Sequence, residues 1–316
     1  MKRLKVGVFG VGSLGQHHAR IYAANPEAEL VGVYDINMDR AREIAAQFKT
    51  QPFDQVDALA GQIEAASIAV PTDHHYKLAC HLMQKDIHLL VEKPISVTTD
   101  EAEEMVRIAE ARGLILQVGH VERFNPVMRY LEEHLTHPRF IEAIRLSTYP
   151  PPREGAAPRG TEVSVVLDLM IHDLEIILHL VNSPLKECHA VGVPILSPTE
   201  DIANARLMFE NGCVANVTAS RISQERMRKI RVFQTDTYLS LDYMNQTGQL
   251  IRKTATGLIP SEVPLEKDEP LVAELRSFVK CVSTRKEPVV TGRHASEALK
   301  LATLLCRQMR QNSKLP

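Results

Sequence analysis

Three side chains of this sequence have the types and spacing needed to move a proton near a polarised oxygen: Lys93, Asp168 and His172. Lys93 follows an apolar strand-like run, and its ammonium could polarise a carbonyl or stabilise an alkoxide. An imidazole such as that of His172 can remove a hydroxyl proton near neutral pH. Asp168 precedes His172 by four residues, so on a helix it would lie one turn away and could orient the ring.

A glycine-rich turn provides a second constellation, GxGxxG, made by Gly10, Val11, Gly12, Ser13, Leu14 and Gly15. It follows an apolar strand and opens a helical pattern, the context in which backbone amides bind a pyrophosphate. Asp35 lies at the end of the next strand, where its carboxylate could accept hydrogen bonds from ribose hydroxyls. This carboxylate would repel a 2′-phosphate and therefore favours NAD over NADP, although Arg40 leaves NADP open.

The stretch from Val163 to Val181 predicts the helix that carries Asp168 and His172. With Glu175 and His179, these residues are spaced four, three and four apart and would share one face of an otherwise aliphatic helix. A polar stripe on such a helix must contact solvent, a partner or a ligand. The alternative to a catalytic role is that the stripe is simply the solvent-exposed face of an amphipathic helix. Zinc is a further alternative, but we expect no metal because a lysine and a nicotinamide together supply the needed charge.

The first 120 residues alternate strand-like and helical runs, which is typical of βαβ units and a parallel sheet. The predicted strands are Leu4 to Phe9, Glu29 to Tyr34, Ala66 to Val70, His88 to Val91 and Ile115 to Val118. The predicted helices are Ser13 to Ala24, Asp39 to Phe48 and Thr99 to Arg112, the last with a capping box at Thr98 and Glu101 and a stop at Gly113.

The second half has longer alternating runs, which predict a large, open, mainly antiparallel sheet. Its strands are Phe140 to Tyr149, Ala203 to Phe209, Val214 to Ser220 and Arg231 to Tyr243, with a hairpin turn at Asn211-Gly212. Further helices are expected at Leu271 to Thr284 and His294 to Gln311. We therefore predict a doubly wound Rossmann domain over residues 1–121 and an α+β domain over 122–316, whose last helix could pack back on the first.

The amino-acid composition argues against several classes of protein. Lysine plus arginine (37) nearly balance aspartate plus glutamate (39), and without a long basic run we expect no nucleic-acid partner. Ionisable groups between Val163 and Val181 argue against a membrane span, and the glycines near the start argue against a secretory signal, so we expect a cytoplasmic protein. Five scattered cysteines without CxxC spacing indicate reduced thiols.

The chain resembles the Gfo/Idh/MocA family, and the likeness spans nearly the whole sequence. Five motifs carry it in order: GVGSLG, VPTDHH (Val70 to His75), VEKPIS (Val91 to Ser96), VGHVERFNP (Val118 to Pro126) and LDLMIHD (Leu167 to Asp173). The resemblance implies a Rossmann domain, a second domain that often mediates dimers or tetramers, and an active site between the two. It departs from the commonest pattern before Asp168, where TEVSVV lacks the paired glycines that many members carry.

The resemblance also implies roles for individual residues. Lys93 would contact substrate and nicotinamide, His172 would accept the proton, and Asp168 would support it. The residues implied along the cofactor, besides the glycine turn with Ser13 and Leu14, are Pro71, Thr72, His75 and Glu92.

The segment VGHVERFNP is similar to that of family members of the UDP-N-acetylglucosamine 3-dehydrogenase type. This likeness implies oxidation of the 3-hydroxyl of a UDP-N-acetylhexosamine, with the substrate near His120, Arg123 and Asn125. Arg153 and Arg159, in a Pro/Gly-rich loop, could meet a diphosphate. Three alternatives stay open: an inositol or free-sugar dehydrogenase, a biliverdin reductase-like reductase, and a non-catalytic NAD-sensing regulator.

Overall fold

The computed structural model describes residues 3–152, 158 and 160–312. The chain falls into two compact units, which are described separately: Met1–Val121 with Glu269–Ser296, and Glu122–Asp268 with Glu297–Pro316. The segment 269–296, which the sequence pattern assigns to the second domain, thus belongs to the first unit.

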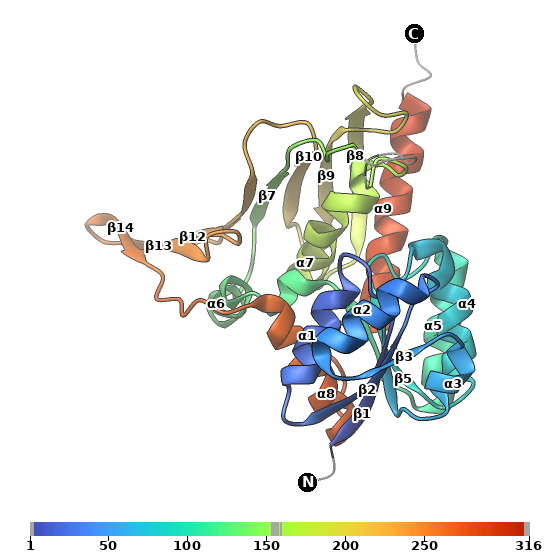
Figure 1. Ribbon diagram of the computed structural model, residues 1–316. Helices are drawn as coiled ribbons and strands as arrows, with labels where there is room; N and C mark the ends of the chain where they lie inside the picture. Colours follow the sequence, from blue (N-terminus) through green and yellow to red (C-terminus); the bar gives the residue numbers. More distant parts are fainter. Residues whose placement is uncertain (1–2, 153–157, 159, 313–316) are drawn as a thin grey trace. The chain divides into compact units, whose positions relative to one another are not determined.

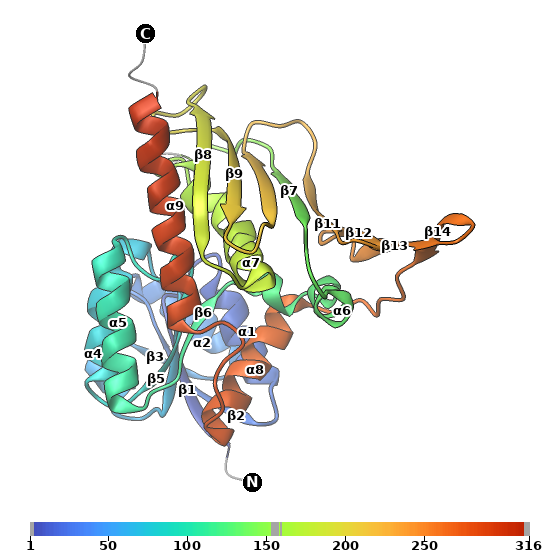
Figure 2. The same cartoon turned by 180° about the vertical axis from the view of Figure 1, so that it is seen from behind.

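The first unit is a doubly wound sheet of six strands in the order β3-β2-β1-β4-β5-β6, and every neighbouring pair runs parallel. The strands are β1 (Leu4–Phe9), β2 (Ala28–Tyr34), β3 (Gln51–Phe53), β4 (Ala65–Ile68), β5 (His88–Glu92) and β6 (Leu116–Gly119). The helical segments are α1 (Gly15–Ala24), α2 (Met38–Phe48), α3 (Val56–Ala60), η1 (Thr72–His74), α4 (His75–Met83), α5 (Thr99–Arg112) and α8 (Pro270–Thr284). Figures 1 and 2 show α1 and α8 on one side of this sheet and α4 and α5 on the other.

The predicted Rossmann architecture is confirmed, and its local signals act as expected. Strand β5 is buried at every position, as a parallel strand covered on both faces must be. Helix α5 begins with the predicted capping box at Thr98 and Glu101 and ends at Gly113 in the left-handed conformation. Strand β3 and helices α3 and α4 are additions that the sequence pattern did not predict.

Helix α8 completes the hydrophobic core of the first unit although it comes late in the chain. Leu275, Phe278, Val279 and Val282 share one cluster with residues of β1, α1 and β2. Burying these side chains against each other stabilises the unit by roughly 25 cal/mol per Å² of apolar surface removed from water.

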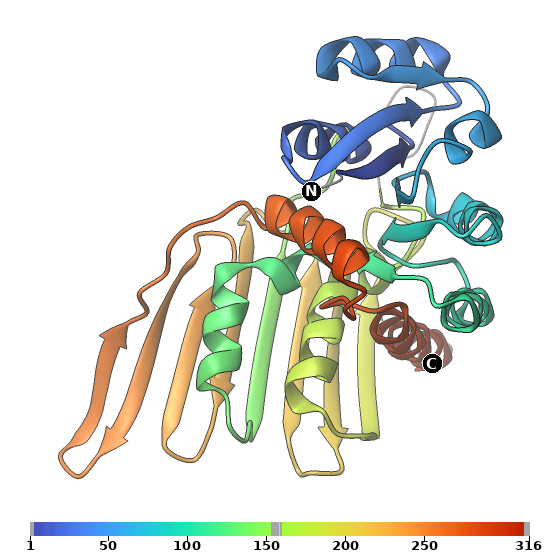
Figure 3. The same cartoon turned by 90° about the horizontal axis from the view of Figure 1, so that it is seen from below.

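The second unit is built on an eight-stranded sheet in the order β14-β13-β12-β11-β7-β10-β9-β8. Its strands are β7 (Phe140–Leu146), β8 (Leu185–Val193), β9 (Ile202–Phe209), β10 (Val214–Ser220), β11 (Met227–Phe233), β12 (Thr237–Asp242), β13 (Thr247–Thr254) and β14 (Gly257–Glu262). Its helical segments are η2 (Val121–Phe124), α6 (Pro126–His134), η3 (Val166–Met170) and α7 (Ile171–Val181). Strands β7 and β10 run parallel and the other neighbours antiparallel. Figure 3 shows α6 and α7 over the same face of this sheet.

Strand β7 shows how the alternating pattern sorts the two faces. Ile141, Ala143 and Arg145 are buried, whereas the residues between them are half-buried. An arginine therefore points into the helix-covered face, where Asp173 of α7 binds it through two hydrogen bonds of 2.7 and 3.1 Å. The mainly antiparallel sheet predicted from the sequence is confirmed.

Two predicted elements are wrong in detail. The run from Arg231 to Tyr243 is not one strand: it folds back after Phe233, with Gln234 N donating to Thr237 O (2.8 Å), and forms part of β11 and all of β12. The helix expected from Val163 begins as the π-helical turn η3, in which the backbone N–H of Ile171 reaches Val166 O. A π-helical turn holds more residues than an α-helical one, so Asp168 is not placed as regular helical spacing implies.

Helix α9 (Gly292–Asn312) starts in the first unit and ends in the second. In the described part of the chain, no helix combines the length and the apolar character that crossing a membrane requires. The cytoplasmic location expected from the sequence stays a prediction.

Candidate functional site

The glycine-rich turn between β1 and α1 has the geometry of a phosphate-binding turn. Gly10 has a φ of +83°, and a Cβ atom there would lie 2.8 Å from the backbone of Ala69. A Cβ on Gly15 would lie 1.8 Å from Gly10 O, so this glycine lets α1 approach the turn. Nothing lies within 4 Å of the corresponding position at Gly12, which leaves that backbone open to a ligand. These three glycines fit the pyrophosphate of a dinucleotide.

Asp35 stands at the end of β2 and is tied to this turn. Its Oδ2 accepts the Val11 N–H (2.8 Å), and its Oδ1 accepts the Asn37 N–H (2.9 Å). Each carboxylate oxygen keeps a further lone pair for a ribose hydroxyl. The Arg40 guanidinium donates to Val11 O (3.0 Å), Gln16 Oε1 (2.9 Å) and Glu43 Oε2 (2.7 Å), so it is already engaged by neighbouring groups.

Glu92 is the last residue of β5 and Lys93 follows it, at the carboxyl edge of the parallel sheet. Glu92 is buried, and its Oε1 lies 2.9 Å from Nε2 of His18, a fully buried residue of α1. Burial alone would raise the pKa of Glu92, but the His18 hydrogen bond and the His18 and Lys93 charges lower it below its ordinary value. The residue directly before Lys93 in the chain therefore favours its ionised form.

The motif VPTDHH is bound to the Glu92-Lys93-Pro94 triplet through His75. Its ring is buried, with Nδ1 2.9 Å from Pro94 O and Nε2 2.9 Å from Val70 O. Burial lowers the pKa of His75, and a neutral ring can donate to one of the two carbonyls at a time. His75 thus supports the loop that carries Lys93, whereas Pro71 is exposed and Thr72 half-buried. Contact of these three residues with the cofactor stays a prediction.

A buried acid that sequence reasoning missed lies on α8. Glu274 is fully buried, and among the described residues neither carboxyl oxygen has a hydrogen-bond partner. Burial, with a smaller contribution from the Glu92 charge, raises its pKa well above the ordinary value. Its spacing from the apolar Leu271 and Phe278 on α8 is the signal that could have identified a buried acid.

In the second unit, Asp168 lies on η3 and His172 in the first turn of α7, and both are half-buried. The other two residues of the predicted polar stripe lie in different surroundings. Glu175 is buried and binds Arg123 (2.7 Å), while His179 lies at an exposed position and binds Glu132 of α6 (2.9 Å).

The three residues of the motif VGHVERFNP that are predicted to contact substrate are buried in the protein. His120 and Arg123 are buried, and Asn125 caps α6 by accepting the Val127 N–H (3.2 Å). These contacts give Arg123 and Asn125 structural tasks, and substrate contact by any of the three stays a prediction. Arg153 and Arg159 lie outside the described residues.

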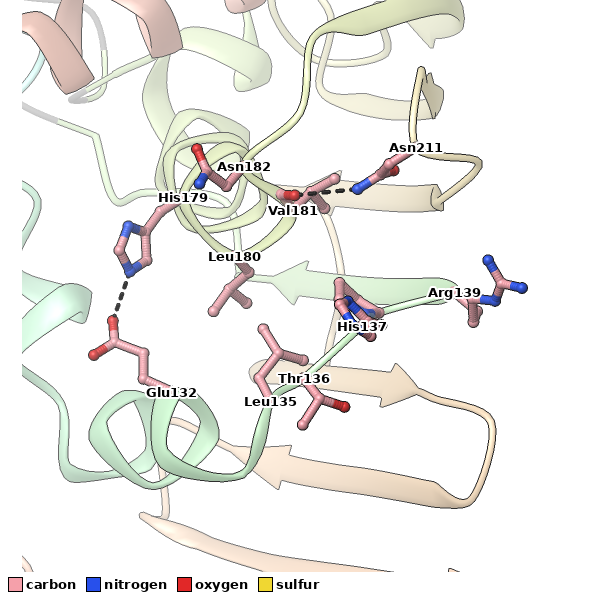
Figure 4. Close-up of a pocket in the computed structure, with 11 residues that line it drawn as sticks. Glu132, Leu135, Thr136, His137, Arg139, His179, Leu180, Val181, Asn182 and Asn211 are labelled. Atoms are coloured by element: carbon pink, nitrogen blue, oxygen red, sulfur yellow. Dashed lines mark hydrogen bonds and ion pairs between the residues drawn. The ribbon is translucent and has the colours of Figure 1, made fainter.

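A pocket of about 610 Å³ lies at the C-terminal ends of α6 and α7 and contains none of the predicted catalytic residues (Figure 4). Glu132 and His179 face each other along one side of it, and Asn211 donates to Val181 O (3.3 Å) on the other. Within residues 3–152, 158 and 160–312, no group of three or more histidine, cysteine or acidic side chains is arranged to hold a metal ion.

Two family models match the chain. The first, described as "Oxidoreductase family, NAD-binding Rossmann fold", covers residues 4–120 and therefore the glycine turn, Asp35 and Lys93. The second, described as "GFO/IDH/MocA C-terminal domain", covers residues 132–240, which include Asp168 and His172.

Comparison with characterised proteins agrees with both models. The UDP-N-acetylglucosamine 3-dehydrogenase of Acidithiobacillus ferrooxidans is 36% identical over 300 residues, which are 92% of this chain and 93% of that protein. A solved structure of it superposes with a TM-score of 0.92 at 35% identity, covering 98% of this chain and 99% of the other. The scyllo-inositol 2-dehydrogenase (NAD(+)) of Bacillus subtilis is 24% identical over 308 residues, 92% of this chain and 89% of that one. The chain therefore belongs to the Gfo/Idh/MocA family of NAD-binding oxidoreductases.

Proposed function

We propose that the protein oxidises the 3-hydroxyl of a UDP-N-acetylhexosamine, with UDP-N-acetylglucosamine as the first substrate to test. The main support is the relative named for that reaction, which aligns with 92% of this chain at 36% identity. The two most similar proteins described above act, by their names, on secondary alcohols of a ring, which supports the same class of reaction.

We further propose NAD rather than NADP as the cofactor. The Asp35 carboxylate, fixed by two backbone N–H groups, would repel a 2′-phosphate placed near the ribose. Arg40, the cation that could favour NADP, donates to Val11 O, Gln16 and Glu43. Three of its five N–H groups are thus engaged, and the Glu43 carboxylate beside it offsets part of the charge that would attract a 2′-phosphate.

In the proposed chemistry, His172 takes the proton of the substrate hydroxyl and Lys93 stabilises the negative charge that develops on that oxygen. Asp168 supports the imidazole from the preceding turn. The glycine turn and Asp35 would hold the dinucleotide, and bound NAD supplies the acceptor for the hydride that leaves the carbon. The His18 hydrogen bond favours the ionised form of Glu92, which precedes Lys93 in the chain.

The test is a substrate screen with NAD and NADP in parallel, read as absorbance of the reduced nicotinamide. UDP-N-acetylglucosamine and UDP-N-acetylgalactosamine are compared with UDP-glucose, free N-acetylglucosamine, glucose and myo- and scyllo-inositol. We expect the highest kcat/KM with a UDP-N-acetylhexosamine and NAD. Turnover confined to inositols or free sugars would replace this proposal with the corresponding dehydrogenase.

Two other functions from the sequence stay distinguishable in the same assay. A biliverdin reductase-like enzyme would consume NADH only with an unsaturated acceptor. A regulator would bind NAD without turning over any of these substrates. We retain the dehydrogenase because a sensor has no need of the lysine, aspartate and histidine together.

We also propose that the protein forms a homodimer or homotetramer through the eight-stranded sheet. On the half-buried face of β7, β11 and β12, Phe140, Phe233 and Tyr238 form a row with ring centroids 5.7 and 4.4 Å apart. An aromatic row on a half-exposed sheet face is typical of a protein interface. Light scattering after gel filtration measures the mass, and a monomer would contradict this proposal.

A further inference from the structure

Arg221, directly after β10, is the largest of the fully buried side chains in the described part of the chain. All of its donor capacity is used inside the second unit. Its N–H groups donate to five acceptors: Asp201 Oδ1 (2.8 Å), Gly160 O (2.6 Å), Val163 O (2.8 Å), Ser197 Oγ (2.8 Å) and Thr199 Oγ1 (2.9 Å). One guanidinium thus joins the strand end, the 195–201 turn and the segment 160–163 that leads into η3.

The carboxylate that neutralises Arg221 is itself fixed from several sides. Asp201 Oδ2 accepts the backbone N–H groups of Ile195, Leu196 and Ser197 at 2.6 to 2.9 Å. Burial alone would raise the pKa of Asp201, but hydrogen bonds from Ser197 and Arg221 outweigh it and hold the pKa below its ordinary range. The ionised form of Asp201 is therefore favoured as the partner of the Arg221 guanidinium, and backbone N–H groups fix the carboxylate in place.

Gly160 connects this pair to the proposed catalytic residues. Its carbonyl accepts from Arg221, its φ is +82°, and a Cβ built on it would lie 2.5 Å from Oδ2 and 2.9 Å from Cγ of Asp168. The Cα face of Gly160 is thus packed directly on the Asp168 carboxyl group. Any other side chain at position 160 would have to displace that carboxylate.

We propose that Gly160, held by Arg221, is a positioning residue that fixes the Asp168 carboxylate and through it His172. This inference rests on the proposed acid/base roles of Asp168 and His172. The segment TEVSVV (161–166) ahead of Asp168 contains no glycine, and Gly160, the residue directly before it, supplies the close backbone approach to the carboxylate.

The first experiment tests the contact without any substrate. Gly160→Ala is compared with Gly212→Ala, because Gly212 has the same φ of +82° but nothing within 4 Å of its Cβ position. We expect Gly160→Ala to lower Tm more than Gly212→Ala does. In an Asp168→Ala background this excess should disappear, since the added methyl group then meets no carboxylate. An equal excess in both backgrounds would overturn the proposal.

The second experiment uses the enzyme with the substrate found in the screen above. Gly160→Ala should lower kcat about 100-fold, the order expected when a catalytic group is misplaced by about 1 Å, with KM for NAD unchanged. The double variant Gly160→Ala/Asp168→Ala should be no slower than Asp168→Ala alone. Full activity of Gly160→Ala would contradict the positioning role. Lack of turnover by the unsubstituted protein would instead refute the proposed function, and the Tm comparison would still decide the contact.

Arg221 is tested by a conservative change because its removal would leave Asp201 buried and unpaired. Arg221→Lys keeps the charge but cannot reach all five acceptors. We expect a folded protein with a kcat loss in the same direction as Gly160→Ala and an unchanged Kd for NADH. A folded Arg221→Lys protein with unchanged kcat would show that Gly160 keeps its place without the guanidinium and would remove Arg221 from the proposal.

Discussion

Lys93 and His172 act on the substrate oxygen in the proposed chemistry. Substituting either residue should therefore stop the reaction without preventing the dinucleotide from binding. Neither residue belongs to the glycine turn or to β2, which would carry the pyrophosphate and ribose contacts. We expect Lys93→Ala and His172→Ala each to lower kcat about 100-fold or more.

The measurement is steady-state kinetics combined with NADH fluorescence titration. Both variants should bind NADH as the unsubstituted protein does, and Lys77→Ala, an exposed lysine of α4, should change neither value. If both variants lost the dinucleotide, the assignment of Lys93 and His172 to chemistry would have to be abandoned.

For single residues, the sequence predicts a role most accurately where that role depends on the conformation of neighbouring backbone. The GxGxxG turn and Asp35 lie in one βαβ unit, and the contacts of Gly10, Gly15 and Asp35 follow from that local order. Contacts between residues far apart in the sequence produce no such local pattern. Nothing in the sequence pairs Arg145 with Asp173 or Arg221 with Asp201, because sheet register and helix packing bring them together.

Among the elements, α5 has the clearest start signal, and its cap can be tested directly. Thr98 accepts the Glu101 N–H (3.3 Å), and the Glu101 side chain accepts the Thr98 N–H (3.1 Å). We expect Thr98→Ala to lower the free energy of unfolding by about 1 kcal/mol, measured by urea denaturation.

Thr98→Ser is the matched control, because serine keeps the capping oxygen. It should restore most of the stability. Equal destabilisation by alanine and serine would mean that the methyl group of Thr98, and not its cap, carries the effect.

Helices and strands long enough to show a regular hydrophobic period were predictable from the sequence, whereas short or interrupted elements were not. Strand β1 and helix α5 have the predicted bounds, since each carries several turns or alternations of pattern. Strand β3 is three residues long, which is too short to show a period. The turn between β11 and β12 contains no glycine or proline, and Asp236 is its only turn-favouring residue, which is a weak signal for a hairpin.

For the molecule as a whole, we expect the buried Glu274 to make the free energy of unfolding depend on pH. Its pKa is raised well above the ordinary value by burial, with a smaller contribution from Glu92. The folded state therefore holds a proton that the unfolded state releases above roughly pH 4.3. Stability is fully present below that pH and is lost as pH rises toward the folded-state pKa, at up to about 1.4 kcal/mol per pH unit from this group.

Glu274→Gln removes this titration while keeping the size of the side chain. We expect the variant to gain stability over the unsubstituted protein as pH rises from 5 to 8, measured by urea denaturation at several pH values. Glu133→Gln, at an exposed position of α6, is the control and should show a constant difference. A Glu274→Gln difference that does not grow with pH would contradict a neutral Glu274.

Helix α8 has a consequence for the order in which the protein can be made. Leu275, Phe278, Val279 and Val282 belong to the core around β1 and α1, yet they are separated from those elements by the whole strand-rich middle of the chain. During synthesis on a ribosome, the nucleotide-binding half must wait, with its apolar surface uncovered, until almost the last residue has been added. A protein truncated at residue 121 should therefore aggregate when expressed, and co-expressing the missing helix should rescue it.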